Sequence, residues 1–163
     1  MMPRMTATLR HFAADDADWL TEQHSTVDAR EEGFDSSFGQ LVGRILQDFV
    51  AQHDPAIERG WIACDGASRL GSIFCVRADD QTAKLRLFLL LPEARGKGLG
   101  RQMLQTCMSF AKATGYQRMQ LWTHAEHEAA CRLYARAGWH LAGSTPVRSF
   151  GVNLTEQTWV IDL

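Results

Sequence analysis

Residues 89–101 read Leu-Leu-Leu-Pro-Glu-Ala-Arg-Gly-Lys-Gly-Leu-Gly-Arg, an apolar run that passes through a proline into a turn with three glycines. The apolar run predicts a buried strand, and the residues after the turn predict an amphipathic helix. Glycines let the backbone approach a ligand and direct successive N–H groups toward one point. The helix start adds unsatisfied donors and a positive dipole end, and Arg95, Lys97 and Arg101 add three cations. The turn therefore predicts a pyrophosphate site.

Two better-known phosphate motifs fit this turn poorly. A Walker loop requires GxxxxGK[ST], which the chain lacks. A dinucleotide fingerprint requires GxGxxG, but Arg101 stands where the third glycine belongs. A glycine-rich connection with solvated basic residues is the plain structural alternative, and the turn alone does not decide against it.

Outward from the turn, hydrophobic periodicity predicts one domain over residues 1–163, with its core at 6–163 and no linker or repeat. Asp15 or Asp16 is expected to cap the first helix. Polar loops are expected at 31–37 and 145–153. The predicted strands are 6–12, 60–64, 70–76, 83–91, 119–123, 139–143 and 157–161, and the predicted helices are 16–28, 38–53, 98–114 and 126–137.

The strand at 83–91 is apolar on both faces in its second half, which is typical of a central strand with helices on each side. Alternation places Leu85, Leu87, Leu89 and Leu91 on one face and Phe88 and Leu90 on the other. Helices come first, a strand meander follows, and strands then alternate with helices. This order predicts an α/β (α+β) domain around one mixed sheet.

Composition narrows the function classes. The chain carries 17 basic and 19 acidic side chains, a formal charge of −2, which argues against a nucleic-acid surface. Its longest apolar run, residues 87–91, is too short to span a bilayer, and no secretory signal is evident. The four cysteines form no CxxC or Cys/His cluster, so no metal site is expected. We therefore expect a cytoplasmic protein without a nucleic-acid or membrane partner.

The turn resembles the [QR]-x-x-G-x-[GA] motif of the GNAT acetyltransferases, and its position after strand-Pro-Glu is similar too. The resemblance implies a mixed, mostly antiparallel sheet with splayed central strands. It also implies acetyl-CoA as cosubstrate, with the pantetheine arm along Leu89 and Leu91. The residues that would hold the pyrophosphate are Arg95, Gly96, Lys97, Gly98, Leu99, Gly100 and Arg101.

A second segment, from His127 to Trp139, resembles the N-x-x-A-x-x-L-Y-x-x-x-G-F segment of the same family. By this resemblance Tyr134 protonates the departing thiolate, as a phenol can. The plain alternative is a core tyrosine bonded to a carbonyl. His127 stands where the family has asparagine, so it is the candidate for that contact with the coenzyme arm. His124 lies close to His127 in sequence, and no third metal ligand is evident at useful spacing.

The general base is less defined, because leucines fill the inner face of the strand before the turn. The whole chain resembles the acetyltransferase half of MarR–GNAT fusion proteins, and this resemblance selects Glu31 and His24 as groups that meet the substrate amine. The plain alternative for Glu31 is a solvated loop charge.

The favoured function is direct transfer of acetyl from acetyl-CoA to the primary amine of a small molecule, in a ternary complex. A non-catalytic acyl-CoA-binding regulatory module and a nucleotide-binding domain are the alternatives. An amino-acid-like acceptor is favoured, because Arg148 and an acidic residue lie in the expected acceptor loops and could hold both its ends. The sequence leaves monomer and homodimer open.

Overall fold

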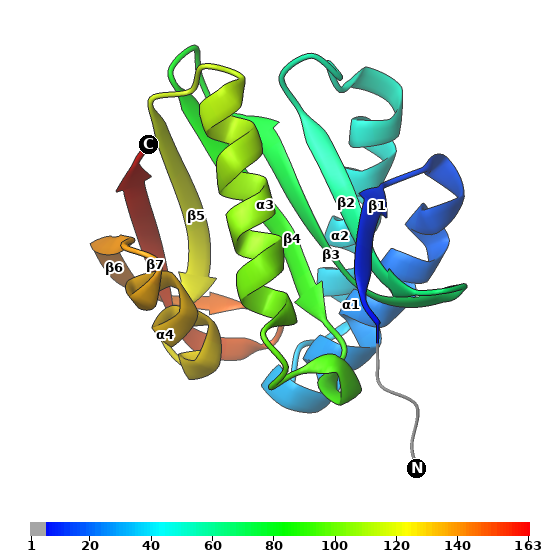
Figure 1. Cartoon of the computed structure of the whole chain (residues 1–163). Coiled ribbons are helices and arrows are strands. Elements are labelled where there is room, and N and C mark those ends of the chain that lie inside the picture. The colour runs from blue at the N-terminus through cyan, green and yellow to red at the C-terminus, as the bar shows by residue number, and fades with distance from the viewer. Residues whose placement is uncertain (1–5) are drawn as a thin grey trace.

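A computed structural model describes residues 6–163, which form one seven-stranded sheet with the strand order β1-β2-β3-β4-β5-β7-β6 (Figure 1). All neighbouring strands are antiparallel except β4 and β5, which are parallel. No helix in this part of the chain has the length and apolar character needed to cross a bilayer. The strands are β1 (Thr8–His11), β2 (Arg59–Asp65), β3 (Ser68–Arg77), β4 (Thr82–Leu90), β5 (Arg118–His124), β6 (His140–Ser149) and β7 (Val152–Asp162), and the helices are α1 (Ala17–Glu32), α2 (Ser36–Gln52), α3 (Leu99–Ala113) and α4 (Glu128–Arg136).

Helices cover the sheet on both faces (Figure 1). Helix α3 lies on one face, where Met103, Leu104 and Cys107 join a core that includes Leu85 of β4. Helices α1 and α2 lie on the other face, where their apolar side chains pack with Leu89 of β4 in a second core. The prediction of a central strand covered from both sides is confirmed for β4.

The two parallel strands separate along their length. Strands β4 and β5 are paired only where residues 82–84 meet residues 118–120. Both strands continue beyond this point, β4 to Leu90 and β5 to His124. The expected splay of central strands is therefore confirmed. Since a strand directs its N–H and C=O groups to both sides, the later part of β4 presents unpaired backbone groups toward the gap.

A β-bulge interrupts β4 and corrects one prediction. Leu87 has φ 50, and the register with β3 shifts by one residue between Ser72 and Phe74. The Ser72 hydroxyl donates to the Leu87 carbonyl at 2.7 Å. One inserted residue moves every later side chain to the opposite face. Leu85 therefore packs on the α3 side while Leu87 and Leu89 pack on the α1/α2 side, so the expectation of one shared leucine face was wrong.

The two expected loops are also different from the prediction. Helix α1 continues through Glu31 and Glu32 to Gly33, which ends it at φ 72 in the left-handed conformation that favours glycine. Residues 145–153 belong to the β6–β7 hairpin, which turns at Phe150 and Gly151. Most of β6 is exposed, so its residues lack the apolar alternation by which a strand is recognised.

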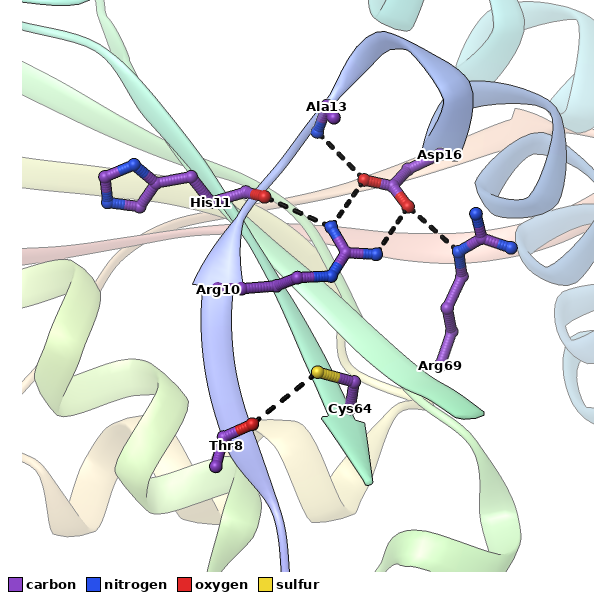
Figure 2. Close-up of polar contacts among 7 residues, drawn as sticks. All are labelled: Thr8, Arg10, His11, Ala13, Asp16, Cys64 and Arg69. Carbon is purple, nitrogen blue, oxygen red and sulfur yellow. Dashed lines mark hydrogen bonds and ion pairs between the residues drawn. The ribbon is translucent and has the colours of Figure 1, made fainter. Parts of the chain in front are cut away.

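Asp16 occupies the N-cap position of α1, but its carboxylate does not cap that helix. It accepts hydrogen bonds from the Ala13 amide at 2.8 Å, from both terminal nitrogens of Arg10 at 2.8 Å and from Nε of Arg69 at 2.9 Å (Figure 2). The side chain is fully buried. These bonds overcome the cost of burial and hold the pKa of Asp16 at about 2, below its ordinary 3.8. The network joins β1, the start of α1 and β3.

We expect Asp16→Asn to destabilise the fold by about 2–4 kcal/mol, because it removes the charge that the two arginines share. The folded pKa lies below the unfolded value, so the stabilising contribution is present above about pH 4. It is lost as the pH falls toward about 2, and it amounts to about 2 kcal/mol. Urea unfolding at pH 7 and pH 2.5 measures both effects, with the exposed neighbour Asp15→Asn as control. An equal loss for both variants would contradict the assignment.

Candidate active site

A cleft of about 410 Å³ opens where β4 and β5 separate. Side chains from α1, α2, β4, β5 and α4 line it, so it reaches both faces of the sheet. Leu89, His24, Glu31, Tyr134 and His127 all line this cleft. The fold thus brings together candidates that lie up to 110 residues apart, from His24 to Tyr134 (134 − 24 = 110).

The glycine turn lies at the mouth of the splay, between β4 and α3. Gly96 and Gly98 adopt φ 78 and φ 81, a conformation that favours glycine. A Cβ at either position would meet nothing within 4 Å, so the space beside the turn is open. Gly98 is the N-cap of α3 and no side chain caps this helix, so its first amides are free for a ligand. Lys97 and Arg101 are exposed beside them.

Other predicted pyrophosphate residues have structural contacts of their own. Leu99 is buried under the turn, and Gly100 lies beside Leu133 of α4 and lines the cleft. Leu91 leaves β4 and donates its amide to the Leu70 carbonyl at 2.9 Å. The free amides and open space of the turn therefore come from its glycines and the start of α3, while these apolar residues hold the turn in place.

Arg95 and Glu31 form a bidentate pair across the cleft. The two terminal nitrogens of Arg95 donate to the Glu31 carboxylate at 2.7 and 2.8 Å, and Nε donates to the Leu90 carbonyl at 3.0 Å. Hydrogen bonds from Arg95 hold the pKa of Glu31 below its ordinary value. Sequence reasoning assigned these residues to separate sites, but here they form one brace between α1 and the glycine turn.

Tyr134 is 4% exposed and lies on α4 among the rings of Phe88, Trp139 and Trp159. Its hydroxyl makes no hydrogen bond within residues 6–163, and the residue lines the cleft. The second tyrosine, Tyr116, donates its hydroxyl to the Ile57 carbonyl at 2.9 Å. Burial raises the pKa of Tyr134, so the phenol keeps its proton across the neutral range. This environment leaves a proton donor facing the cleft.

His24 lies on α1 and is 4% exposed. Its Nδ1 is 3.7 Å from Oδ2 of Asp28, one helical turn later. Its Nε2 is buried and has no hydrogen-bond partner. His24 and Asp28 both line the cleft, so this imidazole lies in the cleft wall with one nitrogen that no group of the described residues engages.

His127 is the N-cap of α4 and lines the cleft beside His124. The backbone turns tightly here, because the His127 amide donates to the His124 carbonyl at 3.0 Å. The two rings stack with centroids 5.7 Å apart. Burial lowers the pKa of His127. Glu32 approaches this pair from α1, so the fold supplies a third ligand atom that local sequence spacing could not reveal.

Sequence reasoning missed two cations in the cleft, Lys84 and Arg86 of β4. Both are half-buried, and neither has an ion-pair partner in the part of the chain that the structure describes. Burial lowers the pKa of both, that of Lys84 to about 8. Lys84 lies 3.5 Å from the ring centre of Trp122. The signal that could have found them is two charges in the middle of an otherwise apolar strand.

The turn of the β6–β7 hairpin packs against two aromatic residues that line the cleft. Phe150 packs against Phe34 and Phe38 with ring centroids 4.9 Å apart, and its carbonyl accepts from the Asp35 amide at 2.9 Å. Arg148, the predicted acceptor-binding arginine, instead donates to the Asn153 side chain and the Gly151 carbonyl within the hairpin. The cations available in the cleft are therefore on β4.

A mixed sheet that opens between two parallel strands, next to a glycine turn at a helix start, defines a class of acyl-CoA-dependent acyltransferases. The model of the acetyltransferase (GNAT) family matches residues 15–139, more than half of the 163-residue chain. The chain belongs to the GNAT acetyltransferase family. The finer resemblance to MarR–GNAT fusions stays a prediction, since this match concerns the acetyltransferase domain.

Solved structures share this fold over nearly their whole length. The structure of yncA from Salmonella typhimurium, solved with its cofactor acetyl-CoA, is 18% identical with a TM-score of 0.78 and covers 96% of this chain and 93% of that one. A GNAT acetyltransferase from Staphylococcus aureus Mu50 is 13% identical with a TM-score of 0.78 and covers 96% and 99%. Likeness at these identities establishes the common fold.

Curated relatives include mycothiol acetyltransferases. The protein from Clavibacter michiganensis is 28% identical over 132 residues, which is 79% of this chain and 41% of the relative. The protein from Actinosynnema mirum is 31% identical over 78 residues, which is 47% of this chain and 26% of the relative. The chain therefore spans less than half the length of these relatives.

Proposed function

We propose that this protein is an N-acetyltransferase that moves acetyl from acetyl-CoA to the primary amine of a small molecule with an anionic group. The observation that carries the proposal is the free, protonated hydroxyl of Tyr134 inside the cleft between β4 and β5. A structural tyrosine with this burial would bond a carbonyl, as Tyr116 does.

The coenzyme lies along the opened strand in this proposal. Its diphosphate binds the free amides of the glycine turn and of α3, with Lys97 and Arg101 beside them. Its pantetheine arm pairs with the unpaired backbone of β4 near Leu89 and runs past His127. Arg95, which Glu31 already engages, holds the turn to α1 rather than contacting phosphate.

Transfer then proceeds directly between the two bound substrates. His24 takes a proton from the acceptor ammonium, and the neutral amine attacks the thioester carbon. Backbone N–H groups of β4 that face the gap stabilise the negative oxygen of the intermediate. The C–S bond breaks as the amide forms, and Tyr134 gives its proton to the leaving thiolate. The second proton of the attacking nitrogen then passes to the tyrosinate and restores the phenol, and His24 releases the first proton to solvent. We assign the base to His24 rather than Glu31, because both Glu31 oxygens are bound by Arg95 and its pKa is lowered.

The acceptor's anionic group is inferred from Lys84 and Arg86. A half-buried guanidinium without an ion pair is costly, and an anionic ligand would offset that cost. Desolvation lowers the pKa of Arg86 and no carboxylate raises it. Asp28 and His24 line the same cleft on α1. The ammonium of a small molecule would therefore meet Asp28 and His24, while its carboxylate would meet the two cations of β4. Amino acids and related amino-carboxylates have this pattern.

A thiol-release assay with acetyl-CoA and an amine panel tests the proposal. The panel contains amino acids, their amides, polyamines, aminoglycosides and the acceptor substrate of the mycothiol acetyltransferase relatives. We expect turnover with the amino-carboxylates and much less with their amides. If the protein binds coenzyme A but no acceptor in the panel causes thiol release from acetyl-CoA, the result would favour the non-catalytic acyl-CoA-binding module.

We expect Arg86→Gln to raise KM for the anionic acceptor by about 10–100-fold, the value of one charge-assisted contact, with KM for acetyl-CoA unchanged. KM for this acceptor should also rise as the pH passes about 8, because Lys84 loses its charge there. Steady-state kinetics from pH 6.5 to 9.5 measure both effects. The exposed Arg118→Gln on β5 is the control. An identical KM for Arg86→Gln and wild type would contradict the anion subsite.

A further inference from the structure

Three side chains from three separate elements converge beside the cleft. Glu32 ends α1, His124 ends β5, and His127 precedes α4. One ligand atom from each lies within 4.8 Å of the others, and Nε2 of His124 is 3.8 Å from Oε2 of Glu32. We propose that Glu32, His124 and His127 bind a divalent transition-metal ion of the zinc class.

The donor set and its geometry suit such an ion. Two imidazoles and one carboxylate with a fourth position left open form an established zinc donor set, with ligand bonds of about 2.0–2.2 Å. In a tetrahedral site these bonds place ligand atoms about 3.3 Å apart, so each side chain here needs about 1 Å of movement. The tight turn from His124 to His127 already fixes two of the ligands side by side.

A second carboxylate supports His124 from behind. Oε2 of Glu126 lies 3.5 Å from Nδ1 of His124, and this nitrogen is buried without a hydrogen bond. The ring therefore has one carboxylate near each nitrogen, Glu126 at Nδ1 and Glu32 at Nε2. A metal-binding histidine commonly turns its second nitrogen to a carboxylate in this way, which fixes the ring and strengthens the ligand.

The surrounding charge favours a cation. Asp28 and Glu32 face His127 from α1, and the facing cation Arg95 is already paired with Glu31. The same charges would attract an ammonium group, but an ammonium needs no imidazole pair. Neutral imidazole is a common metal ligand, and two imidazoles lie side by side here. This pair, and not the negative charge alone, distinguishes a metal site from the end of the acceptor pocket.

Metal binding would connect α1 to the β5–α4 turn across the cleft. His124 and His127 line the cleft, so the ion would lie at its wall. It would draw α1 toward β5 and narrow the space for the coenzyme arm and the acceptor. We therefore expect zinc to slow acetyl transfer and to stabilise the fold.

Titration calorimetry with Zn²⁺ and absorption spectra with Co²⁺ test the proposal on the full chain. We expect one ion per chain, the visible absorption of tetrahedral Co²⁺, and a rise in Tm of about 5 °C or more at a hundredfold excess of zinc over Kd. His124→Ala and Glu32→Gln should each weaken binding at least about a hundredfold, and Glu126→Gln about tenfold or more.

Two variants control for binding elsewhere. His140→Ala removes an exposed histidine, and Cys131→Ser removes the thiol close to the His124 carbonyl. Both should bind zinc like the wild type. Circular dichroism checks that each variant is folded. If His124→Ala does not fold, Glu32→Gln takes its place as the test of zinc binding. Absence of zinc binding, or binding that survives loss of Glu32 and His124, would overturn the proposal whatever the transferase activity.

Discussion

Replacing Tyr134 with Phe is expected to lower kcat for acetyl transfer by about 10²–10⁴-fold, the usual contribution of a positioned acid. The hydroxyl makes no hydrogen bond among the described residues and its pKa is raised by burial, so its loss removes a proton donor and little structure. The Kd for acetyl-CoA should stay within a few-fold of wild type. Stopped-flow thiol release and calorimetry measure the two quantities.

Tyr116→Phe is the matched control for this experiment. It removes the only other tyrosine hydroxyl, which bonds the Ile57 carbonyl outside the cleft. This variant should lose about 1 kcal/mol of stability from the missing bond and keep its kcat. If Tyr134→Phe keeps full kcat, Tyr134 is not the acid.

The second large effect is expected for His24→Gln, which should lower kcat by about 10²-fold by removing the base. The defect should shrink as the pH rises, because more of the acceptor amine is then neutral without help. Glu31→Gln tests the other candidate. It breaks the pair with Arg95 and should therefore raise KM for acetyl-CoA more than it lowers kcat. Rate–pH profiles for both variants give the comparison.

A larger loss of kcat in Glu31→Gln than in His24→Gln would contradict this assignment of the base. An unchanged kcat in both variants would move proton removal to solvent or to another residue of the cleft. Asp28→Asn gives a further test of His24 as the base. Asp28 lies 3.7 Å from His24, so this variant should lower kcat in the same way as His24→Gln but by a smaller factor.

Features encoded within one short segment were predictable from the sequence. The glycine turn at 95–101 and the helix after it depend on neighbouring residues, and both are present as expected. The buried strand before the turn and its central place in the sheet also followed from local composition. The splay of β4 from β5 came from family resemblance, since no local residue encodes it.

Features that depend on distant contacts were not predictable. The bulge at Leu87 is held by Ser72 of the neighbouring strand, and it reverses the faces that simple alternation assigns. The sequence assigned Glu31 to the substrate amine and Arg95 to the pyrophosphate, whereas the fold joins the two in one ion pair. The sequence shows His124 close to His127, but Glu32 is 92 residues from His124 (124 − 32 = 92), so the third ligand had no sequence signal.

Calorimetric titration with coenzyme A, and in parallel with pantetheine, decides whether the glycine turn seats the diphosphate beside Tyr134. The amides of the turn and of α3 predict that coenzyme A binds at micromolar concentration and that pantetheine, which lacks the diphosphate, binds at least about a hundredfold more weakly. No heat with coenzyme A at millimolar concentration, or equal affinity for pantetheine, would contradict the proposed site.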